Sequence, residues 1–124
     1  MTTRKVRLMP LRPELYTNPA CSKCRTAVAL LEEHGVEADT IAYLEEPPTM
    51  EDLTRLMQLL DIDDPRRMMR TGEQLYTELA LADAEGDALL QAISQHPILL
   101  ERPIFVVGDR AVIARPPERL LELL

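Results

Sequence analysis

The spacing of apolar positions changes along the chain, and each change marks a new predicted element. Short runs that alternate or are apolar throughout predict four strands, at 14–17, 38–44, 104–107 and 111–114. Apolar positions at helical spacing predict helices at about 22–34, 49–60, 65–70, 74–79, 87–96 and 116–124. The predicted order is therefore β-α-β, a group of helices, and then β-β-α.

Several residues support the boundaries of these elements. Gly35 stands where a glycine commonly follows a helix. Thr49 is a suitable N-cap, and Glu51 and Asp52 place negative charge in the first turn, where it suits the helix dipole. The sequence Gly-Asp-Arg at 108–110 separates two apolar runs and predicts a hairpin turn.

The element order predicts the fold class. Two strands joined through a helix should be parallel, because a parallel pair needs a crossover connection. The expected structure is α/β with a thioredoxin-like fold, in which helices cover both faces of one mixed four-stranded sheet. We expect an N-terminal extension at 1–13, with a candidate strand at 5–9. A single domain at 14–124 then follows, with a helical insertion at about 49–96.

Composition and charge restrict the classes of partner. Hydrophobic residues make up 46% of the chain and aromatic residues 3%, so the core must be mainly aliphatic. The net charge of −7 argues against a general binder of nucleic acid or of anionic membranes. An anionic ligand must therefore be held by a local cluster of arginines.

The N-terminus does not resemble a signal peptide, because Arg7, Pro10, Arg12 and Pro13 interrupt any apolar stretch. No run approaches the roughly 18 apolar residues that a membrane span needs. We therefore expect the protein in the cytoplasm, where thiols stay reduced.

The two cysteines of the chain, Cys21 and Cys24, form a CxxC motif at the junction of the first strand and the first helix. In a reducing compartment this motif leaves thiol chemistry, metal binding or simple packing as alternatives. Zinc needs two more ligands, and neither His34 nor His96 has ligand spacing to the cysteines. The position at the start of a helix favours thiol chemistry.

The helix start also distinguishes the two thiols. Unpaired backbone N–H groups there favour a thiolate, which predicts Cys21 as the nucleophile. Cys24 lies three residues later on the same helix face, so it is a candidate resolving cysteine. We expect Cys24 to have the higher pKa.

Four segments, in order, carry a family resemblance: YTNPACSKCRTAVALLEEHGVE, YLEEPPT, QHPILLERPIFVV and ARPPERLLELL. Together they resemble the glutaredoxin-linked arsenate reductase family, over about 15–124. The resemblance implies a thioredoxin-like fold in which the first cysteine attacks arsenate. It implies that the oxyanion is bound by Arg70, Arg102 and Arg115. A planar, permanently charged guanidinium suits a tetrahedral oxyanion.

The resemblance also implies two supporting residues, Asn18 before the motif and Pro103 after Arg102. In thioredoxin-like proteins this proline follows a cis peptide bond and faces the cysteine. The sequence departs from the family at two positions. Many members have serine in place of Cys24, and histidine commonly stands where this chain has Thr17.

The resemblance implies an enzyme that reduces arsenate, or a similar oxyanion, to arsenite. Glutathione would act as co-substrate with glutaredoxin, or Cys24 would supply an internal disulfide reduced by thioredoxin. No metal, bound cofactor, nucleic acid or membrane is expected, and a monomer is the default. Two alternatives stay open: a redox-sensing regulator similar to Spx that binds RNA polymerase, and a general thiol–disulfide oxidoreductase.

Overall fold

The computed structural model describes residues 12–124. The candidate strand at 5–9, and most of the expected extension at 1–13, lie outside the described residues. The strands are β1 (Glu14–Thr17), β2 (Asp39–Ala42), β3 (Ile104–Val107) and β4 (Arg110–Ile113). The α-helices are α1 (Ser22–Glu33), α2 (Met50–Leu60), α3 (Gln74–Glu78) and α4 (Asp87–Gln95). The 3-10 helices are η1 (Pro65–Met68), η2 (Leu81–Asp83), η3 (Pro97–Leu99) and η4 (Pro117–Leu123).

The strands form one mixed sheet in the order β2-β1-β3-β4. β1 and β2 are parallel, with Leu15 opposite Thr40. β3 is antiparallel to both β1 and β4, so that Phe105 lies opposite Leu15 on one side and Val112 on the other. The mixed four-stranded sheet and the parallel β-α-β connection predicted from the sequence are confirmed.

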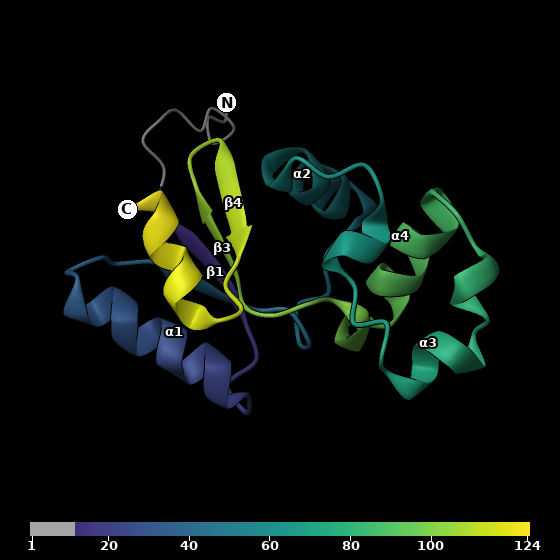
Figure 1. Ribbon diagram of the computed structural model, residues 1–124, viewed down its shortest axis with the longest axis horizontal. Helices are drawn as coiled ribbons and strands as arrows, with labels where there is room; N and C mark the ends of the chain where they lie inside the picture. Colours follow the sequence, from purple (N-terminus) through teal and green to yellow (C-terminus); the bar gives the residue numbers. More distant parts are fainter. Residues whose placement is uncertain (1–11) are drawn as a thin grey trace.

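Successive side chains of the central strands contribute to two separate cores, as the pleat of a strand requires. Leu15 and Phe105 belong to a cluster with α1 and η4, through Ala27, Leu31 and Leu120. Figure 1 shows these two helices together on one side of the sheet.

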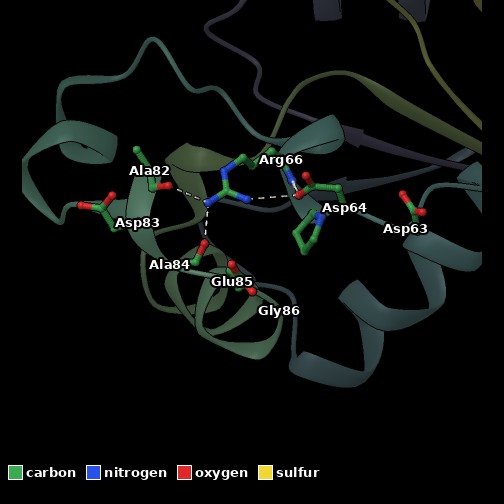
Figure 2. A pocket seen from close by; sticks show the side chains of 9 residues that line it. Asp63, Asp64, Arg66, Ala82, Asp83, Ala84, Glu85 and Gly86 are labelled. Carbon is green, nitrogen blue, oxygen red and sulfur yellow. Dashed lines mark hydrogen bonds and ion pairs between the residues drawn. The ribbon is translucent and has the colours of Figure 1, made fainter.

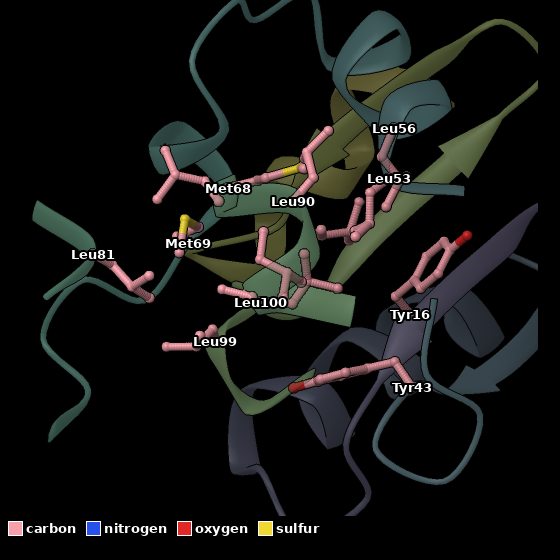
Figure 3. Packing of buried hydrophobic residues seen from close by; sticks show 14 of the residues in the cluster. Tyr16, Tyr43, Leu53, Leu56, Met68, Met69, Leu81, Leu90, Leu99 and Leu100 are labelled. Atoms are coloured by element: carbon pink, nitrogen blue, oxygen red, sulfur yellow. The ribbon is translucent and has the colours of Figure 1, made fainter. Parts of the chain in front are cut away.

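The neighbouring side chains of the same strands, Tyr16 and Ile104, join the other core. There they pack with Leu53 and Leu56 of α2 and with residues of α4, and Figure 3 shows the tyrosine and the two leucines in this cluster. Helices therefore cover both faces of the sheet, as predicted.

The helices between β2 and β3 begin with a well-capped α2. The Thr49 hydroxyl accepts a hydrogen bond from the Asp52 N–H at 3.0 Å, and the Asp52 carboxylate accepts one from the Thr49 N–H at 2.9 Å. This reciprocal arrangement satisfies two N–H groups that would otherwise have no partner. The predicted N-cap is confirmed.

Arg66 joins two parts of the same helical region. Its Nη2 donates to the carbonyls of Leu81 at 2.9 Å, Ala82 at 3.1 Å and Ala84, and its Nε donates to Tyr76 Oη at 2.9 Å. Figure 2 shows the guanidinium pointing toward the carbonyls of Ala82 and Ala84. Arg66 therefore fixes the turn before α4 against η1.

Some predicted boundaries were wrong. β2 ends at Ala42 because the following residues turn, with the N–H groups of Glu45 and Glu46 both donating to the Ala42 carbonyl. Arg110 belongs to β4 and pairs with Val107, so the hairpin loop has two residues rather than three. η2 was not predicted, and the C-terminal helix is of the 3-10 type.

Candidate active site

The sheet topology brings four chain segments to one edge. Cys21 follows the end of β1, and Tyr43 follows the end of the parallel strand β2. Because β3 is antiparallel to β1, Arg102 before its start lies at the same edge. β4 runs back again, so Arg115 after its end lies there too.

Arg70 comes from the helical region and is tied to the segment before β3. Its backbone N–H donates to the Leu99 carbonyl at 2.7 Å, next to an isolated β-bridge between Met69 and Leu100. The Glu101 N–H donates to the Met68 carbonyl at 2.8 Å. This short antiparallel contact fixes Arg70 close to the segment that leads to the β3 edge.

Cys21 is the N-cap residue of α1, with φ −91° and ψ 125°. The loop before it is shaped by Asn18, whose side-chain oxygen accepts from the Ala20 N–H at 3.0 Å. The Asn18 carbonyl also accepts from the Cys21 N–H at 2.8 Å. Cys21 therefore occupies the position from which a side chain normally accepts hydrogen bonds from the first turn of a helix.

The surroundings of Cys21 favour the thiolate. Burial alone would raise the pKa of its thiol, but the nearby N–H of Cys24 and the side chain of Arg102 act in the opposite direction. With further help from the N–H of Lys23, the pKa falls from 9.0 to about 7. Unpaired N–H groups and a cation are the usual causes of such a shift.

Cys24 behaves differently, although it lies one turn further along the same helix. Its residue is fully buried, and burial raises the pKa of its thiol. Its Sγ accepts a hydrogen bond from the Asn18 N–H at 3.4 Å. Both cysteines are free thiols. The order of the two pKa values is the one that their positions on the helix predict.

Arg102 lies beside the Cys21 thiol, and its side chain has unused donors. Its Nε and Nη1 atoms are buried and have no hydrogen-bond partner among residues 12–124. The Arg102–Pro103 peptide bond is cis, which is the isomer expected from the sequence. Buried guanidinium donors without partners are rare, and an anionic ligand next to the sulfur would satisfy them.

The other two predicted arginines already have acidic partners. Arg70 Nη1 donates to Glu73 Oε2 at 2.7 Å. Arg115 Nη1 donates to the Arg102 carbonyl at 2.9 Å, and its Nε lies 3.6 Å from Glu101 Oε1. Arg115 thus contacts the backbone of Arg102, whereas the charge of Arg70 acts on Tyr43.

Tyr43 is a further polar residue of this edge, and the sequence did not single it out. It is fully buried, its hydroxyl has no hydrogen-bond partner among residues 12–124, and Arg102 lies next to it. In the sequence, Tyr43 is only one residue of the predicted strand at 38–44 and of the segment YLEEPPT. A tyrosine at the end of an apolar strand is ordinarily read as part of the core.

Other ligand types find less support in the described part of the chain. No group of three or more His, Cys, Asp or Glu side chains within residues 12–124 is arranged to hold a metal ion. None of the helices described there combines the length and apolar composition that crossing a bilayer requires.

Comparisons with known proteins identify the family to which the chain is similar. The model of the ArsC family matches residues 16–123. The chain is 44% identical over 117 residues to the uncharacterized protein YfgD of Escherichia coli K12, covering 93% of this chain and 98% of that protein. It is 45% identical over 112 residues to an arsenate reductase of Haemophilus influenzae, covering 89% and 97%.

A solved structure described as arsenate reductase from Vibrio cholerae superimposes with a TM-score of 0.88 at 46% identity. The match covers 93% of this chain and 99% of that one. These findings confirm the family resemblance read from the sequence, and with it the thioredoxin-like fold.

Proposed function

The chain belongs to the ArsC family, and from this membership we propose that it reduces arsenate to arsenite through the thiolate of Cys21. The observation that carries the proposal is the pairing of a thiol of lowered pKa with a buried guanidinium that has unused donors. This pairing matches the needs of a reaction in which a thiolate attacks a bound oxyanion.

In the first step, the Cys21 thiolate attacks the arsenic atom and an S–As bond forms. One arsenate oxygen accepts protons and leaves as water, so arsenic stays in its +5 state. Arg102, together with Arg70 and Arg115, stabilises the negative oxygens during the exchange. Asn18 and Pro103 support the loops that hold Cys21 and Arg102 in place.

In the second step, a second thiol attacks the Cys21 sulfur and forms a disulfide. The S–As bond breaks, its electron pair stays on arsenic, and arsenite is released in the +3 state. The second thiol is either glutathione, which leaves a mixed disulfide for glutaredoxin to reduce, or Cys24, which leaves an internal disulfide for thioredoxin. The reaction needs no bound cofactor, and a reducing compartment such as the cytoplasm supplies the electrons.

The whole of 14–124, with the helical insertion at about 49–96, is proposed to act as one domain and as a monomer. The insertion contributes Arg70 to the site through its backbone contact with the segment before β3. This is the reason for treating the insertion as part of the catalytic unit rather than as an appendage.

The test is to mix reduced protein with arsenate and to measure arsenite with three donor systems: glutathione alone, glutathione with glutaredoxin, and thioredoxin with its reductase. Arsenite release with at least one system is expected, and the preferred system identifies the second thiol. Reduction of disulfide substrates without any arsenite would instead favour a general thiol–disulfide oxidoreductase. If the protein shows neither arsenite release nor disulfide reduction but binds RNA polymerase, a regulator similar to Spx is favoured.

A further inference from the structure

The hydroxyl of Tyr43 presents an energetic problem that residues 12–124 do not solve. Its side chain is fully buried, and its hydroxyl has no hydrogen-bond partner among residues 12–124. A buried polar group without a partner destabilises a folded protein. Phenylalanine would fill the same space without this cost, so an acceptor for the hydroxyl proton is missing among residues 12–124.

The neighbours of the hydroxyl indicate the charge of that partner. Arg102 lies next to Tyr43, and Arg70 also acts on it through its charge. An arginine can donate to the tyrosine oxygen, but it offers no acceptor for the tyrosine O–H. No side chain or backbone group among residues 12–124 accepts this proton, and the positive charges of Arg102 and Arg70 favour an anion as the acceptor.

The hydroxyl is not alone in lacking a partner. The Nε and Nη1 atoms of Arg102 are buried and have no partner among residues 12–124 either. The same guanidinium lies beside the Cys21 thiol. Three donor atoms without partners thus occur on Arg102, which lies beside the nucleophile, and on Tyr43, which lies next to Arg102. An oxyanion bound at this place would be within reach of both side chains.

We propose that the Tyr43 hydroxyl donates a hydrogen bond to the oxyanion held by Arg102 beside Cys21. This inference rests on the proposed function and adds to it a neutral donor among the charged ones. Figure 3 shows Tyr43 together with Leu99 and Leu100, whose segment leads to Arg102.

The protonation state of Tyr43 suits this role. Burial raises the pKa of Tyr43 to about 12. The hydroxyl therefore keeps its proton throughout the range in which the Cys21 thiolate forms, with its pKa of about 7. Tyr43 remains a donor and adds no negative charge that would repel the substrate.

The experiment compares Tyr43→Phe with the wild type and uses inorganic phosphate as an unreactive tetrahedral probe. Phosphate protects Cys21 from alkylation, and the concentration that halves the alkylation rate reports its affinity. We expect about a tenfold weaker affinity in Tyr43→Phe, the loss of one hydrogen bond to a charged acceptor. The pH midpoint of Cys21 alkylation without phosphate should stay near 7, because the hydroxyl acts on the anion rather than on the thiol.

Tyr16→Phe is the matched control. Tyr16 is also a buried tyrosine of the same core, and burial raises its pKa to about 12 as well. The charged residues that act on it are Glu14, Asp52 and Arg55, rather than Arg102 and Arg70. Loss of the Tyr16 hydroxyl should leave the protection of Cys21 by phosphate unchanged.

Thermal unfolding is a second measurement, and it separates a hydroxyl that binds an anion from one that only stabilises the fold. Without anion, Tyr43→Phe should unfold at the same or a higher temperature than the wild type, because it removes an unsatisfied group. A lower unfolding temperature would show that the hydroxyl has a partner within the protein and would overturn the inference.

The outcomes separate this inference from the proposed function. If phosphate and arsenate fail to protect Cys21 even in the wild type, the anion site is wrong. That result would contradict both the Tyr43 inference and the proposed function. If these anions protect the wild type and Tyr43→Phe equally, the Tyr43 inference is wrong and the proposed function is not contradicted.

Discussion

Arg102 places a positive charge beside the Cys21 thiol in a protein whose net charge is −7. The pKa of Cys21 falls because N–H groups of the first helical turn and the Arg102 side chain lie next to its sulfur. Both effects act over short distances, so the overall negative charge of the chain, screened by salt, opposes them little. The chemistry therefore depends on individual residues rather than on the field of the molecule.

The first prediction concerns the pH dependence of Cys21 alkylation. Since its pKa is lowered to about 7, the thiolate forms as the pH rises through 7. The rate of alkylation by iodoacetamide should rise around pH 7 and level off above about pH 8. Mass spectrometry of the Cys21 peptide measures this rate, and the unfolded protein is the control. A midpoint near the ordinary value of 9.0 in the folded protein would contradict the assignment.

The second prediction concerns Arg102→Lys. Lysine keeps the charge but loses the planar fork of donors, so the variant should lose transition-state stabilisation of about 1–3 kcal/mol, roughly 5–150-fold in kcat/KM. Steady-state kinetics of arsenite formation measures the loss. Arg119→Lys is the control, because Arg119 is exposed and pairs with Glu122. Equal kcat/KM values for Arg102→Lys and the wild type would show that Arg102 does not act on the substrate.

The candidate site was only partly predictable at the residue scale. The CxxC motif identified Cys21 because a helix start favours a thiolate whatever the rest of the fold. The arginines came from the family resemblance, since their sequence spacing carries no geometric information. Tyr43 was missed because its importance depends on an unsatisfied hydroxyl, which no sequence pattern displays.

At the scale of elements, the first turn of α1 gives its two thiols different roles. Cys21 stands at the N-cap position of the helix, whereas Cys24 is fully buried and its pKa is raised by burial. In the proposed mechanism, the thiol with the raised pKa acts second, after an adduct has formed on the first. Disulfide formation requires the two Cα atoms to be within roughly 7 Å, which a three-residue helical spacing meets.

The third prediction follows for Cys24→Ser. Mild oxidation of the wild type should give an internal Cys21–Cys24 disulfide, with the protein mass lowered by two protons. In Cys24→Ser, oxidation with glutathione should instead trap a mixed disulfide on Cys21. Turnover with thioredoxin should fall more than turnover with glutaredoxin. If the wild type itself gives only glutathione adducts, Cys24 has no part in the reaction.

The fourth prediction concerns the helical region between β2 and β3. Arg66 donates to three backbone carbonyls and to Tyr76, so Arg66→Met should leave several acceptors unpaired. We expect a loss of about 2–4 kcal/mol in the free energy of unfolding. Urea denaturation measures it. Arg67→Met is the matched control, because Arg67 is exposed, and it should change stability by about 0.5 kcal/mol or less. Equal stability of the two variants would contradict the role of Arg66.

The order and type of the strands were predictable because their apolar runs are short and clearly bounded. The errors lie at ends and connections. β2 stops early because the turn after Ala42 uses its carbonyl twice, and η2 follows Ala80, a non-glycine residue with φ 55°. Such features depend on tertiary contacts, as with the Arg66 hydrogen bonds to the carbonyls of Leu81 and Ala82, and no local pattern predicts them.

At the scale of the whole molecule, the strand directions explain how distant segments build one site. The parallel strands β1 and β2 both end at one edge of the sheet. The β3-β4 hairpin begins and ends at that same edge. The helical region adds Arg70 through a backbone contact to the segment before β3. This arrangement is what the proposed function requires, since it has residues from 21 to 115 act on one small anion.

The most direct measurement of the central claim is arsenite formation by the reduced wild type and by Cys21→Ser, with arsenate, glutathione and glutaredoxin. The wild type should form arsenite, and omission of arsenate should leave the Cys21 thiol unmodified. Cys21→Ser should form none while its circular dichroism spectrum and unfolding temperature stay close to those of the wild type, because serine lacks an accessible anion at this pH. Arsenite formation by Cys21→Ser at most of the wild-type rate would contradict the account.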